Sequence, residues 1–343
     1  RFGFAVFVFA VGFVGFAGGF GFCGICAGFG GAGFVCHRFG SGFFCGGFRA
    51  GLGSCRGVLD FTFEVGLDVG EVGVVARVIA GGTALMLGMR QRMLAPTHLI
   101  SVAKIERLRG IDFDATHGLR IGALTRHVDV ARSALVAQHA PVLAQMAGQV
   151  ANPQVRNQGT IGGNLCYADP STDPPGCLMA LDASIVLGSS RGERVLSIEE
   201  FLVDYYITAL EPDEIVLEIR VPIQAPGTQG VYTRFLRTAA EHRPLVSVAF
   251  VAQRNGALCQ SARLAVGAST PIPARLRRAE ECLQGKQVTP EIASEVARIV
   301  AQDITPVSDL RGSEDFRREM VRVVTRRTVA ELFGLDINEG VAA

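Results

Sequence analysis

The stretch NQGTIGGNLCYADPSTDPP, residues 157–175, combines closely spaced glycines, turn-forming residues and two aspartates, and it offers no obvious nucleophile. Gly159, Gly162, Gly163 and Asn164 surround a Thr-Ile pair. Glycines at this density tolerate left-handed backbone conformations and leave amide N–H groups exposed. The stretch therefore predicts a loop that can hold a ligand through its backbone.

Another glycine loop lies upstream, in AGGTALMLGMR at residues 80–90, directly after the short β-type run ARVI at residues 76–79. Consecutive glycines after a strand let the chain turn with positive φ and point amide groups into a concavity that suits a diphosphate. A structural turn explains this loop at least as well. Neither loop has the G-x-G-x-x-G or G-x-x-x-x-G-K-[ST] spacing, so a Rossmann or P-loop assignment has no support.

Length and charge narrow the range of partners. A chain of 343 residues can bury a sizeable core and is expected to form two or three domains. Its 33 basic and 32 acidic residues leave a net charge of +1, which gives no long-range field to attract nucleic acid or an anionic membrane. We expect small molecules or proteins as partners, with no nucleic acid bound and no membrane span.

Residues 1–59 differ from the rest of the chain. They hold 14 of the 22 Phe, they lack Lys, Asp, Glu, Asn, Gln, Thr, Pro, Tyr and Met, and they show neither helical nor strand periodicity. A signal peptide or membrane anchor is one interpretation, although frequent Gly disfavours a helix. A cysteine cluster beginning at Cys23 and Cys26 is a second, but no His or further C-x-x-C of metal-site spacing accompanies it.

We favour a third interpretation, in which residues 1–59 are not the natural polypeptide. The remaining chain uses Arg almost to the exclusion of Lys, which occurs only at Lys104 and Lys286, as expected of a GC-rich gene. An out-of-frame reading of such a gene yields strings of this kind. The first Met is Met86, so the natural start is not visible.

Periodicity predicts the elements after residue 74. Strands are expected near residues 98–103 and 118–124, followed by a helical region. Six apolar residues there have the spacing of a core-facing stripe: Val128, Ala131, Leu135, Val142, Leu143 and Met146. Cys166 and Cys177 are expected to be buried thiols that fill space, since neither has a His or second thiol nearby in sequence.

The C-terminal third alternates strand and helix signals. The runs YTRFL, LVSVAFVAQ and ARLAVGA predict strands, and residues 273–285, 289–302 and 313–332 predict helices. Thr289 with Pro290, and Ser313 with the acidic residues after it, mark two helix starts. The buried stripe of the last helix is expected to be Phe316, Met320, Val323 and Val324.

Four motifs in one order carry a family resemblance. VIAGGTAL, TIGGNLCYADPSTDPP, LEPDEIVLEIRVP and TPVSDLRGSEDFRREMVRVVTRRT resemble the FAD-binding medium subunit of molybdenum hydroxylases, the xanthine dehydrogenase and carbon monoxide dehydrogenase family. The resemblance covers roughly residues 74–333. It implies an α+β fold, with a two-lobed FAD-binding domain (PCMH-type) at residues 60–224. A C-terminal antiparallel sheet with helices, similar to that of CO dehydrogenase flavoproteins, would span residues 229–335, and residues 1–59 would be a low-complexity segment.

The resemblance also implies site residues. The first glycine loop comprises Val78, Ile79, Ala80, Gly81, Gly82, Thr83, Ala84 and Leu85, and the second comprises Thr160, Ile161, Gly162, Gly163 and Asn164. In the family the two loops hold the FAD diphosphate between them. Asp173 matches a cofactor-contacting Asp, Val216 a strand residue near the flavin, and Arg234 a position where many relatives have Lys.

These assignments carry no catalytic residue and no metal ligand. A carboxylate repels a diphosphate, so hydroxyl or amide donors are the sensible partners of Asp173. Capping of a helix or turn beside its DPP sequence is the alternative role for this residue.

The implied function is electron transfer. FAD in this chain would receive electrons from [2Fe-2S] clusters and pass them to a final acceptor, with the molybdenum cofactor in another subunit. Partners would be an iron–sulfur small subunit and a molybdenum-binding large subunit, in a cytoplasmic heterotrimer or its dimer, and the chain alone would not act on substrate. Two alternatives remain: a scaffold subunit without flavin, and a stand-alone FAD oxidase of the vanillyl-alcohol type, for which the region after residue 74 is short.

Overall fold

The structure is a computed structural model that describes residues 35–39, 42–46 and 75–336. The chain separates into two compact units, one of them spanning residues 9–68. In that unit, strands β1 (Val35–Phe39) and β2 (Gly42–Gly46) pair antiparallel, within a segment that shows no strand period. The remaining expectations for residues 1–59 lie outside the described residues.

The described part of the other unit starts with a small parallel pair. Strand β3 (Ala76–Ile79) pairs with β4 (His98–Ser101), and helix α1 (Leu85–Arg90) lies between them in the chain. Both strands were predicted. A short 3-10 helix, η1 (Glu106–Leu108), follows.

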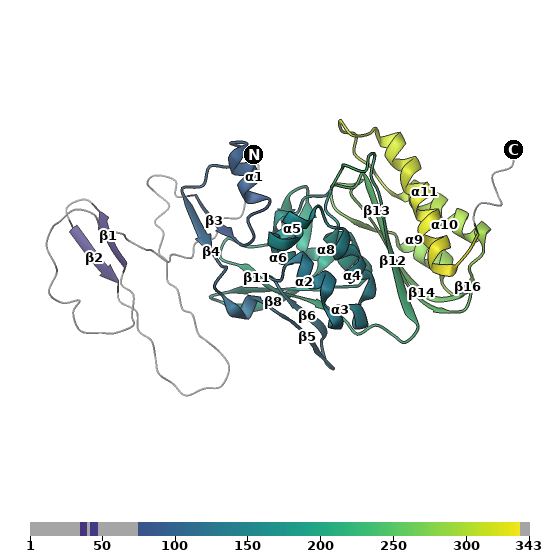
Figure 1. The fold of residues 1–343 in the computed structure, drawn as a ribbon, viewed down its shortest axis with the longest axis horizontal. Helices are drawn as coiled ribbons and strands as arrows, with labels where there is room; N and C mark the ends of the chain where they lie inside the picture. Colours follow the sequence, from purple (N-terminus) through teal and green to yellow (C-terminus); the bar gives the residue numbers. More distant parts are fainter. Residues whose placement is uncertain (1–34, 40–41, 47–74, 337–343) are drawn as a thin grey trace. The chain divides into compact units, whose positions relative to one another are not determined.

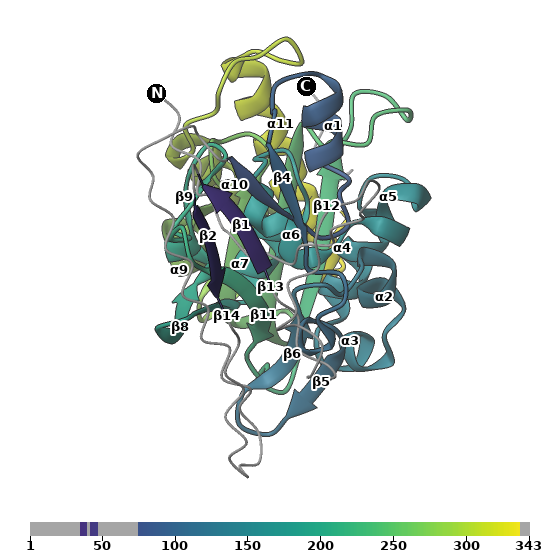
Figure 2. The same ribbon diagram turned by 90° about the vertical axis from the view of Figure 1, so that its left-hand side faces the viewer.

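A five-stranded antiparallel sheet comes next, in the order β5-β6-β11-β7-β8. Its strands are β5 (Ile111–Asp114), β6 (Gly118–Gly122), β7 (Ser184–Ser189), β8 (Gly192–Ser197) and β11 (Ile215–Val221). The short strands β9 (Leu202–Asp204) and β10 (Ile207–Thr208) form a separate pair. Helix α6 lies beside the central strand β11 (Figures 1 and 2).

Seven helices accompany this sheet in the described residues: α2 (His127–Arg132), α3 (Ala134–His139), α4 (Pro141–Gln149), α5 (Pro153–Gln158), α6 (Ile161–Tyr167), α7 (Pro174–Ala180) and α8 (Ile198–Phe201). The predicted stripe is correct for α4, where Val142, Leu143 and Met146 are buried. Upstream it is partly correct, since Ala131 and Leu135 pack against the same core, but Ser133 caps a new helix there and shifts the phase. Val130 and Val136 are fully buried there, whereas the expected residues are only half-buried.

The C-terminal sheet is antiparallel, in the order β12-β13-β14-β15, and β16 also pairs with β14. Its strands are β12 (Thr228–Phe235), β13 (Val246–Asn255), β14 (Leu258–Gly267), β15 (Ala274–Arg275) and β16 (Lys286–Gln287). Strand β13 is buried on both faces. Val248 and Phe250 pack in one cluster and Ala249 and Val251 in the other, as the two-residue repeat of a strand requires.

Helices cover both faces of this sheet. Helix α9 (Arg277–Leu283) contacts β14, helix α11 (Glu314–Phe333) contacts β12 and β13, and helix α10 (Pro290–Asp303) packs on α9 and α11 (Figure 1). Helices α4 and α7 contact the sheet as well and share a hydrophobic cluster with Ala249 and Val251. The predicted α+β class, with a C-terminal antiparallel sheet carrying helices, is confirmed.

The last two long helices test the predicted caps and stripe. Thr289 accepts a hydrogen bond from Ile292 N and Ser313 accepts one from Phe316 N, so both helix starts are correct. The expected stripe of α11 is correct for Val324 and partly correct for Met320, which is half-buried against the same cluster. It is wrong at its start, since Phe316 is exposed and the face begins with buried Arg317. The guanidinium of Arg317 donates to Leu245 O at 3.2 Å and Ala268 O at 2.9 Å, which makes its burial tolerable.

No helix within residues 75–336 combines the length and the apolar character needed to cross a bilayer.

Candidate functional site

The first glycine loop follows strand β3 directly. Gly82 has φ of 74°, as the glycine pattern predicted, and Ala84 precedes the first turn of α1. Within the part of the chain that the structure describes, the amide groups of residues 81–84 donate to no backbone or side-chain acceptor. Successive amides without acceptors form a concavity that binds anions.

The second glycine loop is the start of a helix. Thr160 is the N-cap of α6, and its hydroxyl accepts a hydrogen bond from Gly163 N at 3.2 Å. The amide of Ile161 donates to Thr125 O at 2.9 Å, and that of Gly162 to Ala123 O at 3.0 Å. The first three amides of α6 are therefore already satisfied by the protein.

This geometry corrects the expected left-handed conformation. Gly162 and Gly163 have helical backbone without positive φ. Gly162 is needed for a different reason, since a Cβ at this position would lie 2.6 Å from the Cβ of Ala123 and 2.8 Å from its carbonyl oxygen. The glycine permits close packing of α6 on the residue that follows strand β6.

The structure brings the two glycine loops into contact. A Cβ on Gly81 would overlap the carbonyl oxygen of Gln158, and one on Gly159 would lie 3.2 Å from the hydroxyl of Thr83. The position of a Cβ on Gly163 is 3.9 Å from the Cβ of Ala80. The loops are thus apposed through backbone, as the resemblance implied.

Asn164 adds a polar group at this contact. Its Oδ1 atom is buried and has no hydrogen-bond partner among the described residues. Since a buried acceptor without a donor costs free energy, this atom suits a ligand that supplies a donor.

Asp173 lies at the start of α7, is 2% exposed as a residue, and makes no side-chain cap bond. Tyr232 donates its hydroxyl to Asp173 Oδ1 at 2.6 Å, and Arg234 Nη1 lies 3.5 Å from Oδ2. Burial raises the pKa of Asp173 to about 6, against the opposing effects of the Tyr232 and Arg234 hydrogen bonds. The predicted alternative role as a cap is wrong, because the carboxylate instead binds strand β12.

Val216 has apolar surroundings, whereas Arg234 lies beside the Asp173 carboxylate. Val216 is buried in the cluster that contains Ile161 and Leu165. Its neighbour Leu217 packs in another cluster, against the side chains of Val78 and Ala80 from the first glycine loop. Contact of Val216 with a flavin stays a prediction.

Sequence reasoning missed Gln158, Ala123 and Tyr232. Gln158 and Gly159 directly precede the second glycine loop, so proximity in sequence was an available signal. Tyr232 is two residues before Arg234 and therefore shares its face of strand β12. Ala123 is far away in sequence and carried no signal.

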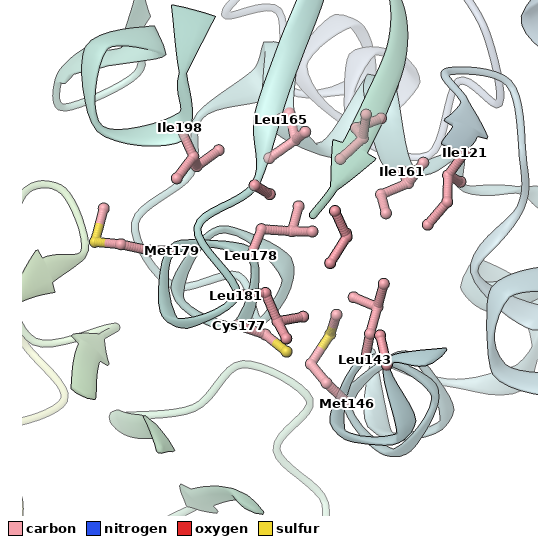
Figure 3. Packing of buried hydrophobic residues seen from close by; sticks show 14 of the residues in the cluster. Ile121, Leu143, Met146, Ile161, Leu165, Cys177, Leu178, Met179, Leu181 and Ile198 are labelled. Atoms are coloured by element: carbon pink, nitrogen blue, oxygen red, sulfur yellow. The ribbon is translucent and has the colours of Figure 1, made fainter. Parts of the chain in front are cut away.

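The two cysteines have different outcomes. Cys177 is fully buried near Leu143, Met146 and Leu181 (Figure 3), and burial raises its pKa, as expected for a thiol that fills space. Cys166 is exposed as a residue, contrary to the expectation, although burial of its thiol group raises the pKa of that thiol to about 12.

Family models match both halves of the described chain. Residues 63–224 match the FAD binding domain in molybdopterin dehydrogenase, and residues 231–332 match the CO dehydrogenase flavoprotein C-terminal domain.

Individual relatives agree with these matches. The carbon monoxide dehydrogenase medium chain of Hydrogenophaga pseudoflava is 33% identical, over 76% of this chain and 90% of that protein. Subunit alpha of the 6-hydroxypseudooxynicotine dehydrogenase complex of Paenarthrobacter nicotinovorans is 32% identical, over 75% of this chain and 86% of its own length.

Solved structures share the fold. Carbon monoxide dehydrogenase from Hydrogenophaga pseudoflava, in a form lacking the Mo-pyranopterin moiety, gives a TM-score of 0.71 at 34% identity, over 74% of this chain and 88% of that chain. Quinoline 2-oxidoreductase from Pseudomonas putida 86 gives a TM-score of 0.72 at 29% identity, over 76% of this chain and 90% of that chain.

The fold and the family matches together define a flavoprotein subunit of an oxidoreductase. The chain belongs to the FAD-binding medium subunits of the molybdenum hydroxylase family, which includes carbon monoxide and xanthine dehydrogenases.

Proposed function

We propose that this chain holds FAD where the two glycine loops meet, and that it transfers electrons as one subunit of a larger molybdenum hydroxylase. The observation that carries the proposal is the run of open amides at residues 81–84, placed in contact with the backbone of residues 158–159. Backbone donors of this kind suit the diphosphate of FAD.

The two loops would contribute differently. The first glycine loop would supply amide donors, and the positive φ of Gly82 holds its turn in place. The second has its first three helical amides bonded to protein acceptors, so it would contribute the side chain of Asn164 and a close backbone surface. When bound, FAD supplies the redox chemistry, while these residues position it and exclude water.

The assignment of Asp173, Val216 and Arg234 to the cofactor site is also proposed. Asp173 and Arg234 are already joined to each other, and Asp173 also to Tyr232, which supports a shared polar group at the boundary of the two sheets. Since Asp173 is buried and already hydrogen-bonded, it would act on a donor of the ligand rather than on the diphosphate.

Partner subunits complete the proposed function. Relatives are named as a medium chain or as a subunit of a dehydrogenase complex. By analogy, [2Fe-2S] clusters and the molybdenum cofactor would be carried by a small and a large partner subunit, in a cytoplasmic heterotrimer or its dimer. The chain alone would then show no substrate-dependent reduction of its flavin.

The visible spectrum of the purified chain, before and after acid precipitation, tests the cofactor assignment. Yellow flavin released into the supernatant is the expected result. A colourless protein would favour the scaffold function, and flavin retained in the pellet would favour a covalent flavin oxidase. Flavin reduction by an aldehyde or aromatic heterocycle, added to the isolated chain, would contradict the need for partner subunits.

A further inference from the structure

A buried contact joins the C-terminal sheet to the residue that precedes α7. Tyr232 on β12 donates its hydroxyl to Asp173 Oδ1 at 2.6 Å, and the buried side chain of Ser247 on β13 acts on the pKa of Tyr232 in the lowering direction. All three residues are buried, at 2%, 2% and 1% exposure. A buried phenol that donates to a buried carboxylate is a fixed electrostatic contact rather than a solvent-screened one.

The surroundings of Asp173 make Tyr232 its main partner. Arg234 Nη1 is 3.5 Å from Oδ2, at the limit of a hydrogen bond, so its guanidinium supplies mostly charge. The thiol of Cys177 is the other titratable group that senses this carboxylate, and burial raises its pKa, so it stays neutral. Tyr232, Arg234 and Cys177 are thus the titratable groups facing Asp173, from β12 and from α7 itself.

We propose that Tyr232 is a positioning residue for the flavin site: its buried hydroxyl fixes the orientation and the charge of the Asp173 carboxylate. This inference rests on the proposed function, since Asp173 is taken there as a group that faces the cofactor. It makes the C-terminal sheet a functional part of the site, because an element of that sheet sets the charge of a residue in the FAD-binding domain.

The pH dependence follows from the direction of the shift. The pKa of Asp173 is raised to about 6, because burial opposes its charge, and the Tyr232 hydrogen bond acts in the lowering direction. Removing that hydroxyl therefore raises the pKa further. The stability contributed by protonated Asp173 is fully present below its unfolded pKa and is lost as pH rises through the folded value, so this loss should move to higher pH in the variant.

The experiment compares Tyr232→Phe with Tyr205→Phe, which removes a hydroxyl from an exposed tyrosine. FAD retained per protein after desalting is measured from pH 5 to 9. Below its midpoint a protonated Asp173 should hold FAD less well. We expect the midpoint of Tyr232→Phe to move upward by about one to two pH units, the amount that one hydrogen bond to a charged group represents. Tyr205→Phe should keep the parent midpoint.

Tyr232→Phe and Tyr205→Phe are also made in a chain that carries Asp173→Asn. This distinguishes an effect on the charge of Asp173 from an effect on packing. The shift should vanish there, because no carboxyl remains to titrate. A uniform loss of FAD at every pH, or a shift that persists in the Asp173→Asn background, would overturn the proposal. Ser247→Ala gives a second test if Tyr232→Phe does not fold: it leaves the phenol in place and removes the side chain that lowers the pKa of Tyr232, so it should produce a smaller upward shift, and an unchanged midpoint would count against the proposal.

Failure of the proposed function can be distinguished from failure of the proposal for Tyr232. If the chain binds no FAD at any pH, urea unfolding of the flavin-free chain against pH still reports Asp173. An upward displacement of its pH midpoint in Tyr232→Phe, absent when Asp173→Asn is also present, would support the positioning of Asp173 by Tyr232 alone. No displacement would refute it.

Discussion

Both glycine loops contain a Gly-Gly pair with a Thr and an Ile close by, and they use the glycines in opposite ways. In the first, Gly82 adopts positive φ and the amides of residues 81–84 have no acceptor in the described chain. In the second, Gly162 and Gly163 are helical, and their amides are hydrogen-bonded to Ala123 and Thr160. One loop offers its backbone to a ligand, and the other uses glycine to let a helix approach a neighbouring segment closely.

A glycine motif therefore need not contact a ligand along its whole length. A glycine that carries positive φ, one that exposes amides and one that removes a Cβ all look alike in sequence. Variants can separate these roles, because each should affect cofactor binding and folding in a different ratio.

The largest effect is expected from Gly162→Val. The new Cβ would lie 2.6–2.9 Å from Ala123 backbone and Cβ atoms, which cannot rotate away. We expect a loss in free energy of unfolding of at least about 2 kcal/mol, with FAD lost as a consequence. Urea unfolding and flavin absorbance measure the two effects.

A matched control for Gly162→Val is Gly148→Ala, whose new Cβ contacts only Ala131 at 4.0 Å and should be mild. Gly192 has open space around its Cβ, but its φ of 124° makes it unsuitable as a control. Wild-type stability of Gly162→Val with full FAD loss would show that Gly162 serves the ligand instead.

A smaller and more selective effect is expected from Gly82→Ala. A residue with a Cβ pays about 1 kcal/mol to adopt the φ of 74° found at Gly82. The new Cβ would contact only the flexible side chains of Ile79 and Met86, at 3.3–3.4 Å. FAD affinity should fall about tenfold, because the turn that presents the amides is disturbed. Circular dichroism should show folded helices. Unchanged affinity would indicate that the first glycine loop is only a turn.

Asn164→Ala probes the side-chain contribution of the second glycine loop. Removing an acceptor that has no partner in the described protein should not lower the free energy of unfolding. If the atom accepts from FAD, affinity should fall by about 1 kcal/mol, roughly fivefold. Isothermal titration with FAD measures it. Equal affinity in Asn164→Ala and the parent would remove Asn164 from the site.

The smallest effect on FAD content is expected from Cys177→Ser, because Cys177 lies in neither glycine loop. The thiol is fully buried and lies 3.8 Å from Val142 O, which a serine hydroxyl could also contact. FAD content should stay nearly unchanged, while the midpoint of thermal unfolding falls slightly because a more polar atom is buried. A large loss of flavin would give this thiol a role beyond filling space.

Local signals predicted the fold well where one segment determines its own structure. Thr289 and Ser313 cap helices as expected, and the alternation in β12 to β14 gave a real sheet. The stripe of α11 was mispredicted because its buried face starts with Arg317, a charged residue that only three-dimensional hydrogen bonding explains.

The same distinction between local signals and long-range contacts applies to the predictions for the site. The positive φ of Gly82 and the apposition of the loops agreed with prediction, the latter through the family resemblance. The packing of Gly162 on Ala123 and the bond from Tyr232 to Asp173 join residues 39 and 59 positions apart in the chain, and no local pattern encodes such pairs. The domain boundaries near residues 60, 224 and 229 and the cofactor roles of individual residues remain predictions.

The backbone contact of Gly81 with Gln158 bears on how a flavin-free descendant of such a protein would be recognised. Any side chain at residue 81 would overlap the carbonyl oxygen of Gln158, whether or not a cofactor is bound. Selection for folding alone would therefore preserve this glycine after cofactor binding had been lost. Relaxed constraint should show first at Asn164, whose unpartnered oxygen the fold itself does not require.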